Sequence, residues 1–341
     1  YTTGVANPYL LLEPSRTNSF INSEYFVAWN SSNVSLTTNS ITSPQGVVNA
    51  SSLTDDAVNS RHRINVSDSF TSGTSYTVSV FVKKNSSNRF LLINASTAFN
   101  ARAALNLDTL EITNINGTKG KIEDYGNGWY RFSVSGQATN TTSQNIYIQM
   151  QNTASDSSYV GDGSSFYLWG AQLEAGSYAT SYIPTYSVSA TRVYDYIKYI
   201  DLQSKGIITA SQGTFLIEID NYDFTAVQLD VQSPTLSYAL RPTFRKNLVD
   251  IFQRVNGVQT TVRQITGLPA GRRIVAMSWN GTNLITSVNG VSYTDTIDGS
   301  IAAELFKIDR PNFNGTIFDL NQLLMFSTQL TEAELNTLTT L

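Results

Sequence analysis

The chain has 341 residues and a formal net charge of −4, and only 14% of its residues are charged, against roughly 25% in ordinary soluble proteins. The absence of cysteine excludes disulfides, cysteine-ligated zinc and thiol catalysis, and a single histidine excludes a metal site built from several histidines. The acidic balance argues against general nucleic-acid binding, and the lack of any apolar run of roughly 20 residues argues against membrane insertion.

The first half of the chain contains segments in which apolar and polar residues alternate with a period of two. Residues 76–82, 129–135 and 145–150 show this pattern most clearly, and glycine-rich or asparagine-rich turn signals separate them. Each such strand needs one buried face, and the connections between the strands are short. The pattern therefore predicts antiparallel strands packed as a sandwich of two sheets.

A second group of strand-like segments follows an uncharged stretch that ends at Arg192. Residues 214–219, 273–279 and 284–288 alternate in the same way. The last element begins with Thr331 and has a glutamate three residues later, which is the spacing of a helix capping box. The sequence predicts an all-β fold of two tandem antiparallel β-sandwiches, residues 1–190 and 191–341, with a short C-terminal helix.

Two segments carry a resemblance to a protein family. Residues 10–18, LLLEPSRTN, are similar to the LLLEPxRTN segment of structural proteins of tailed bacteriophages, and residues 169–185, which begin WGAQLEAG, are similar to the segment that closes the same domain. The intervening pattern resembles the jelly-roll carbohydrate-binding modules of bacterial glycanases. Residues 278–291 and 315–341 resemble a laminin-G or concanavalin-type sandwich.

The resemblance implies an extracellular protein on a virion surface, in a fibre, the tail or a capsid decoration. Such a protein would bind bacterial surface polysaccharide without altering it and would contact other virion proteins. Fibre-type assemblies are commonly three-fold, so a homotrimer is expected by analogy. Because the chain begins at Tyr1 and not at methionine, we expect a fragment or a processed product. Two alternatives remain open, a purely structural module of virion assembly and a glycanase or polysaccharide lyase.

Sugar recognition requires flat apolar rings for stacking, flanked by planar hydrogen-bonding side chains. The candidate glycan-binding residues are aromatic residues of the strand-like segments, namely Trp129, Tyr130, Tyr147, Tyr167 and Trp169. Neighbours on one strand point to opposite faces, so Trp129 and Tyr130 cannot both face the core. The alternative is that these rings fill the core or pack across strands.

Residues 241–273 combine seven basic residues with one acid, Asp250, in an otherwise acidic protein. The basic residues are Arg241, Arg245, Lys246, Arg254, Arg263, Arg272 and Arg273. Guanidinium groups bind carboxylate, sulfate and phosphate through two parallel hydrogen bonds. The segment is therefore a candidate site for an anionic ligand such as an acidic glycan, and the alternative is a solvated face or a subunit contact with acidic neighbours. Its few aromatic residues disfavour nucleic acid.

Three carboxylates resemble a catalytic pattern. Glu218, Asp220 and Asp223 follow the Glu-x-Asp-x-x-Glu strand of laminarinase-type glycanases, although the last member is an aspartate. Two carboxylates on one face would suit glycoside hydrolysis. The alternative is a half-buried structural strand, and we expect that none of the three is catalytic.

The single histidine, His62, lies between two arginines and could serve as a base oriented by Asp55 or Asp56. No Gly-x-Ser-x-Gly nucleophile elbow is present, so a structural histidine is the favoured interpretation. No cofactor is expected. A structural calcium ion remains open, because carboxylates and carbonyls of a loop such as residues 161–163 would suffice to bind it.

Overall fold

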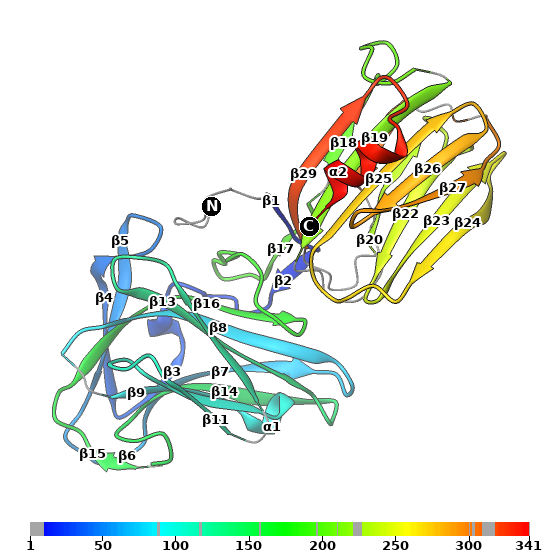
Figure 1. Ribbon diagram of the computed structural model, residues 1–341. Coiled ribbons are helices and arrows are strands. Elements are labelled where there is room, and N and C mark those ends of the chain that lie inside the picture. The colour runs from blue at the N-terminus through cyan, green and yellow to red at the C-terminus, as the bar shows by residue number, and fades with distance from the viewer. Residues whose placement is uncertain are drawn as a thin grey trace. The chain divides into compact units, whose positions relative to one another are not determined.

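The computed structural model describes residues 10–86, 89–115, 118–156, 158–195, 197–209, 211–220, 227–299, 301, 304–308 and 318–340. The described chain is predominantly β-structure and divides into two compact units (Figure 1). One unit is Ser15–Arg192, called the inserted unit below. The other combines Tyr1–Pro14 with Val193–Leu341 and is called the flanking unit.

The inserted unit contains two six-stranded antiparallel sheets. The first has the order β12 (Lys119–Asp124), β13 (Trp129–Gln137), β8 (Ser75–Lys84), β16 (Ser165–Ala175), β5 (Val48–Asp55) and β4 (Val34–Thr42). The second has the order β11 (Ile112–Ile115), β10 (Ala101–Asn106), β9 (Phe90–Ala95), β14 (Thr142–Gln151), β7 (His62–Phe70) and β3 (Asn30–Ser32). The smaller elements are β2 (Arg16–Asn18) paired with β17 (Ala190–Arg192), β6 (Asn59–Ser60) paired with β15 (Tyr159–Val160), η1 (Phe26–Ala28) and α1 (Ser96–Phe99).

Alternation along the strands separates a core from two outer faces in this unit. Val78, Val80 and Val82 of β8 point into the core, where they meet Ile146 and Ile148 of β14 from the opposite sheet. The residues between them point away from the core, as a period of two requires. The alternating segments of the sequence therefore correspond to strands with one buried face.

One irregularity interrupts the alternation along β16. The register between β16 and β8 shifts between Trp169 and Gln172. Gly170 occupies this bulge with φ of 60°, and a Cβ there would lie 2.9 Å from the ring of Phe81. Glycine is required both by the left-handed backbone and by the close approach of the ring. The bulge lets Trp169 and Gln172 share the outer face of the sheet.

The flanking unit is a second sandwich. One sheet has the order β1 (Leu10–Leu12), β29 (Phe318–Phe326), β19 (Gln212–Asp220), β25 (Arg273–Asn280), β26 (Asn283–Val288) and β27 (Val291–Thr296). The other has the order β18 (Ile197–Tyr199), β28 (Leu305–Ile308), β21 (Asp230–Gln232), β22 (Ala239–Arg245), β23 (Leu248–Val255) and β24 (Val258–Thr266), and β20 (Val227–Gln228) also pairs with β22. The expected fold of two antiparallel sandwiches is confirmed.

The C-terminal helix α2 (Glu332–Thr339) covers the outer face of the β19–β25–β26 layer (Figure 1). Thr331 accepts a hydrogen bond from the backbone of Glu334, and the Glu334 carboxylate accepts one from the backbone of Thr331, so the predicted capping box is present. Leu335 of the helix packs on Leu216 and Ala276 of the sheet. Among the described residues, no helix has the length and apolar character needed to cross a bilayer.

The path of the chain differs in one respect from a tandem arrangement. Residues 10–12 were expected in the first sandwich, but β1 pairs with β29 of the flanking unit, and Leu12 is buried in the core of that unit. The chain then enters the inserted unit through β2 and leaves it through β17, which is paired with β2. Periodicity cannot assign a three-residue strand to a sheet, because so short a segment fits either one. One sandwich is therefore nested within the sequence of the other.

Candidate functional site

The two tryptophans expected to bind sugar lie in a buried cluster on the outer face of the sheet that contains β13, β8 and β16. Trp129 and Trp169 are 2% and 4% exposed, and they share the cluster with Phe81 and Tyr182. The ring centres of Trp169 and Tyr182 are 4.6 Å apart. The indole N–H of Trp129 donates to the carbonyl of Thr42 at 3.1 Å. The faces of both indoles are packed against protein.

Tyr182, from the second of the two segments singled out in the sequence, packs on Trp169, and the two segments meet at Asn18. The Asn18 side chain is fully buried and accepts hydrogen bonds from the backbone N–H groups of Phe20 and Leu173. Its amide donates to the carbonyls of Ala171 and Ile183 at 3.1 and 2.8 Å. The two donor hydrogens and the carbonyl oxygen of the amide are thus all used. The asparagine ties residues 10–18 to residues 169–185.

Further buried hydrogen bonds hold the segment after β16 on the sheet. Glu174 accepts from the backbone N–H and the hydroxyl of Thr180, both at 2.7 Å. Arg131 of β13 donates to the carbonyl of Thr180 and to the hydroxyl of Ser79. Buried polar groups are costly unless they are paired, so these contacts fix the cover in place. Asn18, Glu174 and Thr180 of the two segments singled out in the sequence therefore serve to stabilise the fold.

The remaining aromatic candidates do not form one surface. Tyr130 is half-buried and packs against the core between the two sheets. Tyr167 is half-buried at the tryptophan cluster, on the opposite face of the same sheet. The five predicted glycan-binding residues are thus divided between the core, a covered outer face and, for Tyr147, the second sheet.

Tyr147 of β14 lies on the outer face of the second sheet, in a row of polar side chains. The register pairs it with Asn65 of β7 on one side and with Asn94 of β9 on the other, and Asn94 in turn is paired with Arg102 of β10. Side chains directly opposite one another in antiparallel strands share a face and lie in contact distance. All four are partly exposed. A ring flanked by amides is the composition that sugar recognition requires.

Two more residues complete this surface, which is called the β14 face below. Arg63 of β7 is paired in register with Gln149 of β14, and its guanidinium carbon lies 4.3 Å from the centre of the Tyr147 ring. A guanidinium over an aromatic ring is a favourable contact that orders both groups. The β14 face thus comprises Arg63, Asn65, Asn94, Arg102, Tyr147 and Gln149, of which Gln149 is buried and the other five are partly exposed.

Sequence reasoning found only Tyr147 in this group. The signal for its neighbours on β7 was present, because the alternation of residues 62–70 places Arg63 and Asn65 on one side and Ile64 on the other. The pairing of four strands across the sheet was not visible, because it depends on register between segments that are far apart in sequence.

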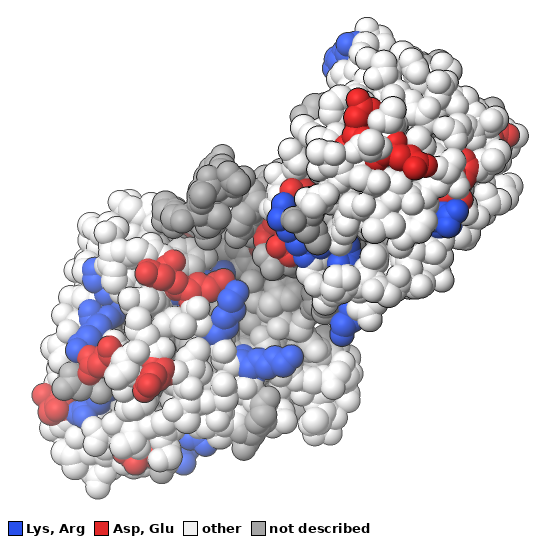
Figure 2. Space-filling view, in the orientation of Figure 1, with Lys and Arg blue, Asp and Glu red and all other residues white. Residues whose placement is uncertain are grey.

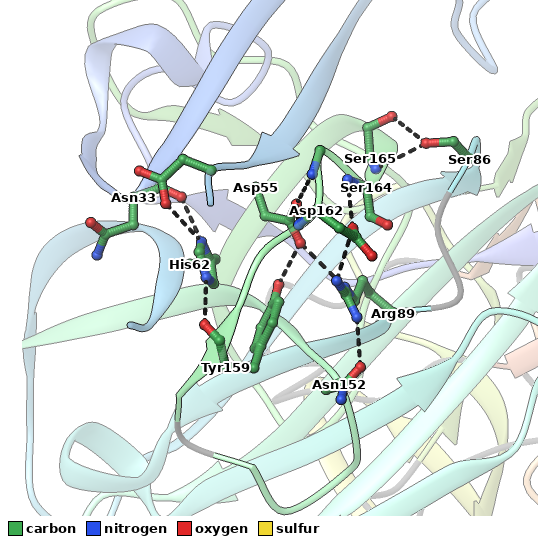
Figure 3. Close-up of polar contacts among 12 residues, drawn as sticks. Asn33, Asp55, His62, Ser86, Arg89, Asn152, Tyr159, Asp162, Ser164 and Ser165 are labelled. Atoms are coloured by element: carbon green, nitrogen blue, oxygen red, sulfur yellow. Dashed lines mark hydrogen bonds and ion pairs between the residues drawn. The ribbon is translucent and has the colours of Figure 1, made fainter. Parts of the chain in front are cut away.

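The densest polar cluster of the inserted unit surrounds Asp55 (Figure 3). The buried carboxylate accepts hydrogen bonds from Arg89 at 3.2 Å, from the hydroxyl of Tyr159 at 2.9 Å, and from the backbone N–H groups of Asp162 and Gly163. The Arg89 guanidinium also contacts Asp162 at 2.9 Å. Burial, together with the charge of Asp55, raises the pKa of Tyr159 above its ordinary value.

His62 lies beside this cluster and is fully buried. Its Nδ1 is 2.7 Å from the carbonyl oxygen of Asn33 and its Nε2 is 3.1 Å from that of Tyr159. The carboxylate of Asp56 approaches Nδ1 at 3.6 Å, whereas Asp55 is engaged with Arg89 and Tyr159. Both ring nitrogens therefore face backbone oxygens rather than a nucleophile. This geometry supports the structural interpretation of His62.

The loop at residues 161–163, considered for calcium, is arranged around Arg89 instead. Its two nearby carboxylates, Asp55 and Asp162, both contact the guanidinium. A Cβ on Gly161 would lie 1.9 Å from the carbonyl oxygen of Asp56, so the loop approaches that strand as only glycine permits. Within the described ranges, no cluster of three or more acidic or histidine side chains is suited to holding a metal ion.

The basic segment 241–273 does not gather into one positive surface. Arg241 is buried and pairs with Asp230, Arg263 pairs with Asp295 at 2.6 Å, and Arg272 pairs with Glu218 at 2.7 Å. Each of these acids lies outside the segment, so the fold brings in negative charges that the sequence window lacked. Arg245 pairs with Asp250 within the segment at 3.0 Å.

The other basic residues of the segment are placed separately. Arg273 is fully buried and donates to the carbonyl of Lys246 at 3.2 Å, Lys246 itself is exposed, and Arg254 is half-buried. In the view of Figure 2, basic and acidic surfaces are interspersed. The excess of positive charge seen in the sequence is largely neutralised in the fold.

Of the carboxylates considered for catalysis, Glu218 is held by contacts within the fold. Glu218 is buried and accepts hydrogen bonds from Arg272 and from Asn321 at 3.0 Å. The hydrogen bond from Arg272 to Glu218, together with the negative charge of Glu218, raises the pKa of Arg272. Asp220 is half-buried on the same strand, and Asp223 lies outside the described residues. Glu218 thus anchors two side chains of its own sheet.

No family model matches this chain, and no curated protein matches it. Among solved structures it is similar to a chain described as a receptor-binding domain and to one from botulinum neurotoxin type C, whose cell entry is described as dependent on two ganglioside molecules. Both are 9% identical over 43% of this chain with a TM-score of 0.35, and the match spans 40% and 39% of their own lengths. Domains LG4–5 of mouse laminin α1 are 10% identical over 97% of both chains, with a TM-score of 0.26. Similarity at this level assigns neither a family nor a function.

Proposed function

We propose that this protein is a non-enzymatic, glycan-binding component of a virion surface, located in a fibre, the tail or a capsid decoration. It would hold bacterial surface polysaccharide reversibly on the β14 face of the inserted unit. The virion assignment is supported by the two segments that resemble phage structural proteins. Single contacts of this kind are weak, so useful adhesion requires several copies that act together.

The observation that carries the proposal is the Tyr147 ring in its row of amide and guanidinium groups. The Asn94 amide oxygen accepts from Ser96 and the Asn65 amide nitrogen donates to Asn145, so the groups that face sugar hydroxyls are the Asn94 N–H groups and the Arg102 guanidinium as donors and the Asn65 carbonyl as acceptor. The Tyr147 ring provides an apolar surface for the C–H groups of a sugar ring. The outer face of the first sheet, in contrast, carries its aromatic rings under a cover fixed by Asn18 and Glu174.

The proposal is tested by incubating the full chain on an array of bacterial surface polysaccharides. Tyr147→Ala should weaken binding by about tenfold or more, because stacking on an aromatic ring contributes on the order of 1 kcal/mol beyond area burial. Tyr125→Ala is the matched control, since Tyr125 is 47% exposed and lies between β12 and β13 of the other sheet. Absence of binding to every glycan would contradict the proposal, and an equal loss in both variants would contradict the choice of surface.

A purely structural role in virion assembly is favoured by a different observation. Tyr186 and Val188 are both 66% exposed and lie two residues apart near the end of the inserted unit. Large apolar side chains exposed together are typical of contacts with another protein. In an assembled particle, burial of these residues together with the β14 face would support assembly, whereas a β14 face open to solvent supports adhesion.

A further inference from the structure

The β14 face differs in charge from the rest of this acidic protein. Arg63 and Arg102 both lie on it, and none of the strand residues that the structure describes on this face is an aspartate or glutamate. Their Nε atoms are buried, and neither has a hydrogen-bond partner among the residues that the structure describes. The face therefore carries two positive charges that no carboxylate of the same surface neutralises.

Three other arginines are paired with carboxylates, whereas Arg254 and Arg273, like Arg63 and Arg102, have a buried Nε with no hydrogen-bond partner among the described residues. Arg89, Arg241 and Arg263 each form an ion pair with an aspartate, at sites that are partly or fully buried. A guanidinium held on a partly buried surface without a carboxylate is a binding group for an anion, because its fork of donors is ordered in advance. Arg63 is ordered by its contact with the Tyr147 ring.

The two arginines also flank the proposed sugar-stacking ring. Arg63 is on β7 and Arg102 on β10, with β14 and β9 between them. Neighbouring strands are about 4.8 Å apart, and Arg63 lies two residues along its strand from the row that contains Arg102 and Tyr147, so the two backbone positions are separated by roughly 16 Å. Tyr147 and Asn94 occupy the positions between them. A polysaccharide that lies across the strands would present its ring to Tyr147 and its substituents to the arginines on either side.

We infer that the β14 face selects acidic polysaccharides, which carry carboxylate, sulfate or phosphate substituents, over neutral ones. This inference rests on the proposed glycan-binding function of the same face. Its chemistry is the bidentate hydrogen bonding of Arg63 and Arg102 to anionic substituents, while Tyr147 stacks on the sugar. The paired arginines of residues 241–273 take no part in it.

The test compares acidic bacterial polysaccharides that bind the full chain with forms of the same polymers whose carboxylates have been reduced to alcohols or whose sulfate or phosphate groups have been removed. Arg63→Gln and Arg102→Gln should each weaken binding to the acidic form by about tenfold or more and should leave binding to the neutralised form unchanged. They should also reduce the dependence of affinity on salt concentration. Tyr147→Ala should weaken binding to both forms.

The matched control is Arg245→Gln, which removes the same charge from an exposed arginine paired with Asp250 in the flanking unit. It should leave binding unchanged, and an equal loss in this variant would transfer the anionic site to residues 241–273. Arg63→Lys and Arg102→Lys keep the charge and guard against misfolding, and they should recover part of the affinity. Carboxylate, sulfate and phosphate are distinguished by separate treatments, because only the loss of the group that is bound weakens binding.

Two results would overturn the inference. If the glycans that bind are neutral and depend on Tyr147, the proposed function stands and the selectivity for acidic polymers does not. If single-stranded DNA binds as tightly as the acidic glycans at the same salt concentration, the face recognises charge alone. Absence of binding to any polysaccharide would remove the proposed function and, with it, this inference.

Discussion

Leu12 offers a sharp test of the nested chain path, because it lies early in the sequence and belongs to the flanking unit. It is 5% exposed in a core shared with Ile217 and Phe244. Leu→Ala in a core typically costs 2–5 kcal/mol, and a three-residue edge strand can relax, so we expect Leu12→Ala to cost about 2–3 kcal/mol. In a unit of roughly 160 residues this lowers the melting temperature by about 5–10 °C. Differential scanning calorimetry measures the shift.

Hydrogen exchange then identifies which unit is destabilised. Leu12→Ala should speed exchange in β19 and β29 of the flanking unit and leave β8 and β14 of the inserted unit unchanged. The control is Leu11→Ala on the same strand, where the side chain is 38% exposed and the cost should be below about 0.5 kcal/mol. Faster exchange in the inserted unit after the Leu12 substitution would refute the nested path.

Three further predictions concern Asn18, Tyr159 and Glu218. Asn18→Ala should destabilise the inserted unit by at least about 3 kcal/mol in urea unfolding, because two buried N–H groups and two carbonyls lose their partner; a change below 1 kcal/mol would contradict its role. The raised pKa of Tyr159 means that the folded state holds the phenol proton more tightly than the unfolded state does. The stability that this proton contributes is therefore present below about pH 10 and lost at higher pH. Tyr159→Phe should flatten the fall in unfolding free energy between about pH 10 and 11, and an unchanged slope would argue against this role of Tyr159. Reducing-end assays should detect no polysaccharide cleavage by the chain. Glu218→Gln should lower only the free energy of unfolding of the protein, by about 1–2 kcal/mol. Polysaccharide cleavage that this substitution abolishes would restore the enzyme alternative.

The sequence predicted the sandwiches because their strands carry a local signal. Residues 76–82, 129–135 and 273–279 fall within β8, β13 and β25, where each strand has one face in a core. The capping box is equally local, and both of its hydrogen bonds form at the start of α2. Periods and caps depend on residues that are near one another in the chain, which is why they can be read without a structure.

The candidate sites depended on partners that are distant in sequence, and this is where the predictions were incomplete. Trp169 alternates outward from the core as expected, but its cover depends on Asn18, which lies about 150 residues earlier. Arg263 was counted as an unpaired charge, and its partner Asp295 lies on a strand of the other sheet. The composition of a segment gives the net charge of that segment. The electrostatic potential at a surface depends instead on all the charged side chains that the fold places near it.

The pairing of β2 with β17 has a consequence for how such a protein can change over time. A stretch whose beginning and end are neighbours can be exchanged for another stretch with equally close ends, and the surrounding structure keeps both of its pieces. Recombination at the codons on either side of residues 15 and 192 would replace a whole jelly roll in a single event. The flanking unit would stay the same while one inserted unit is exchanged for another.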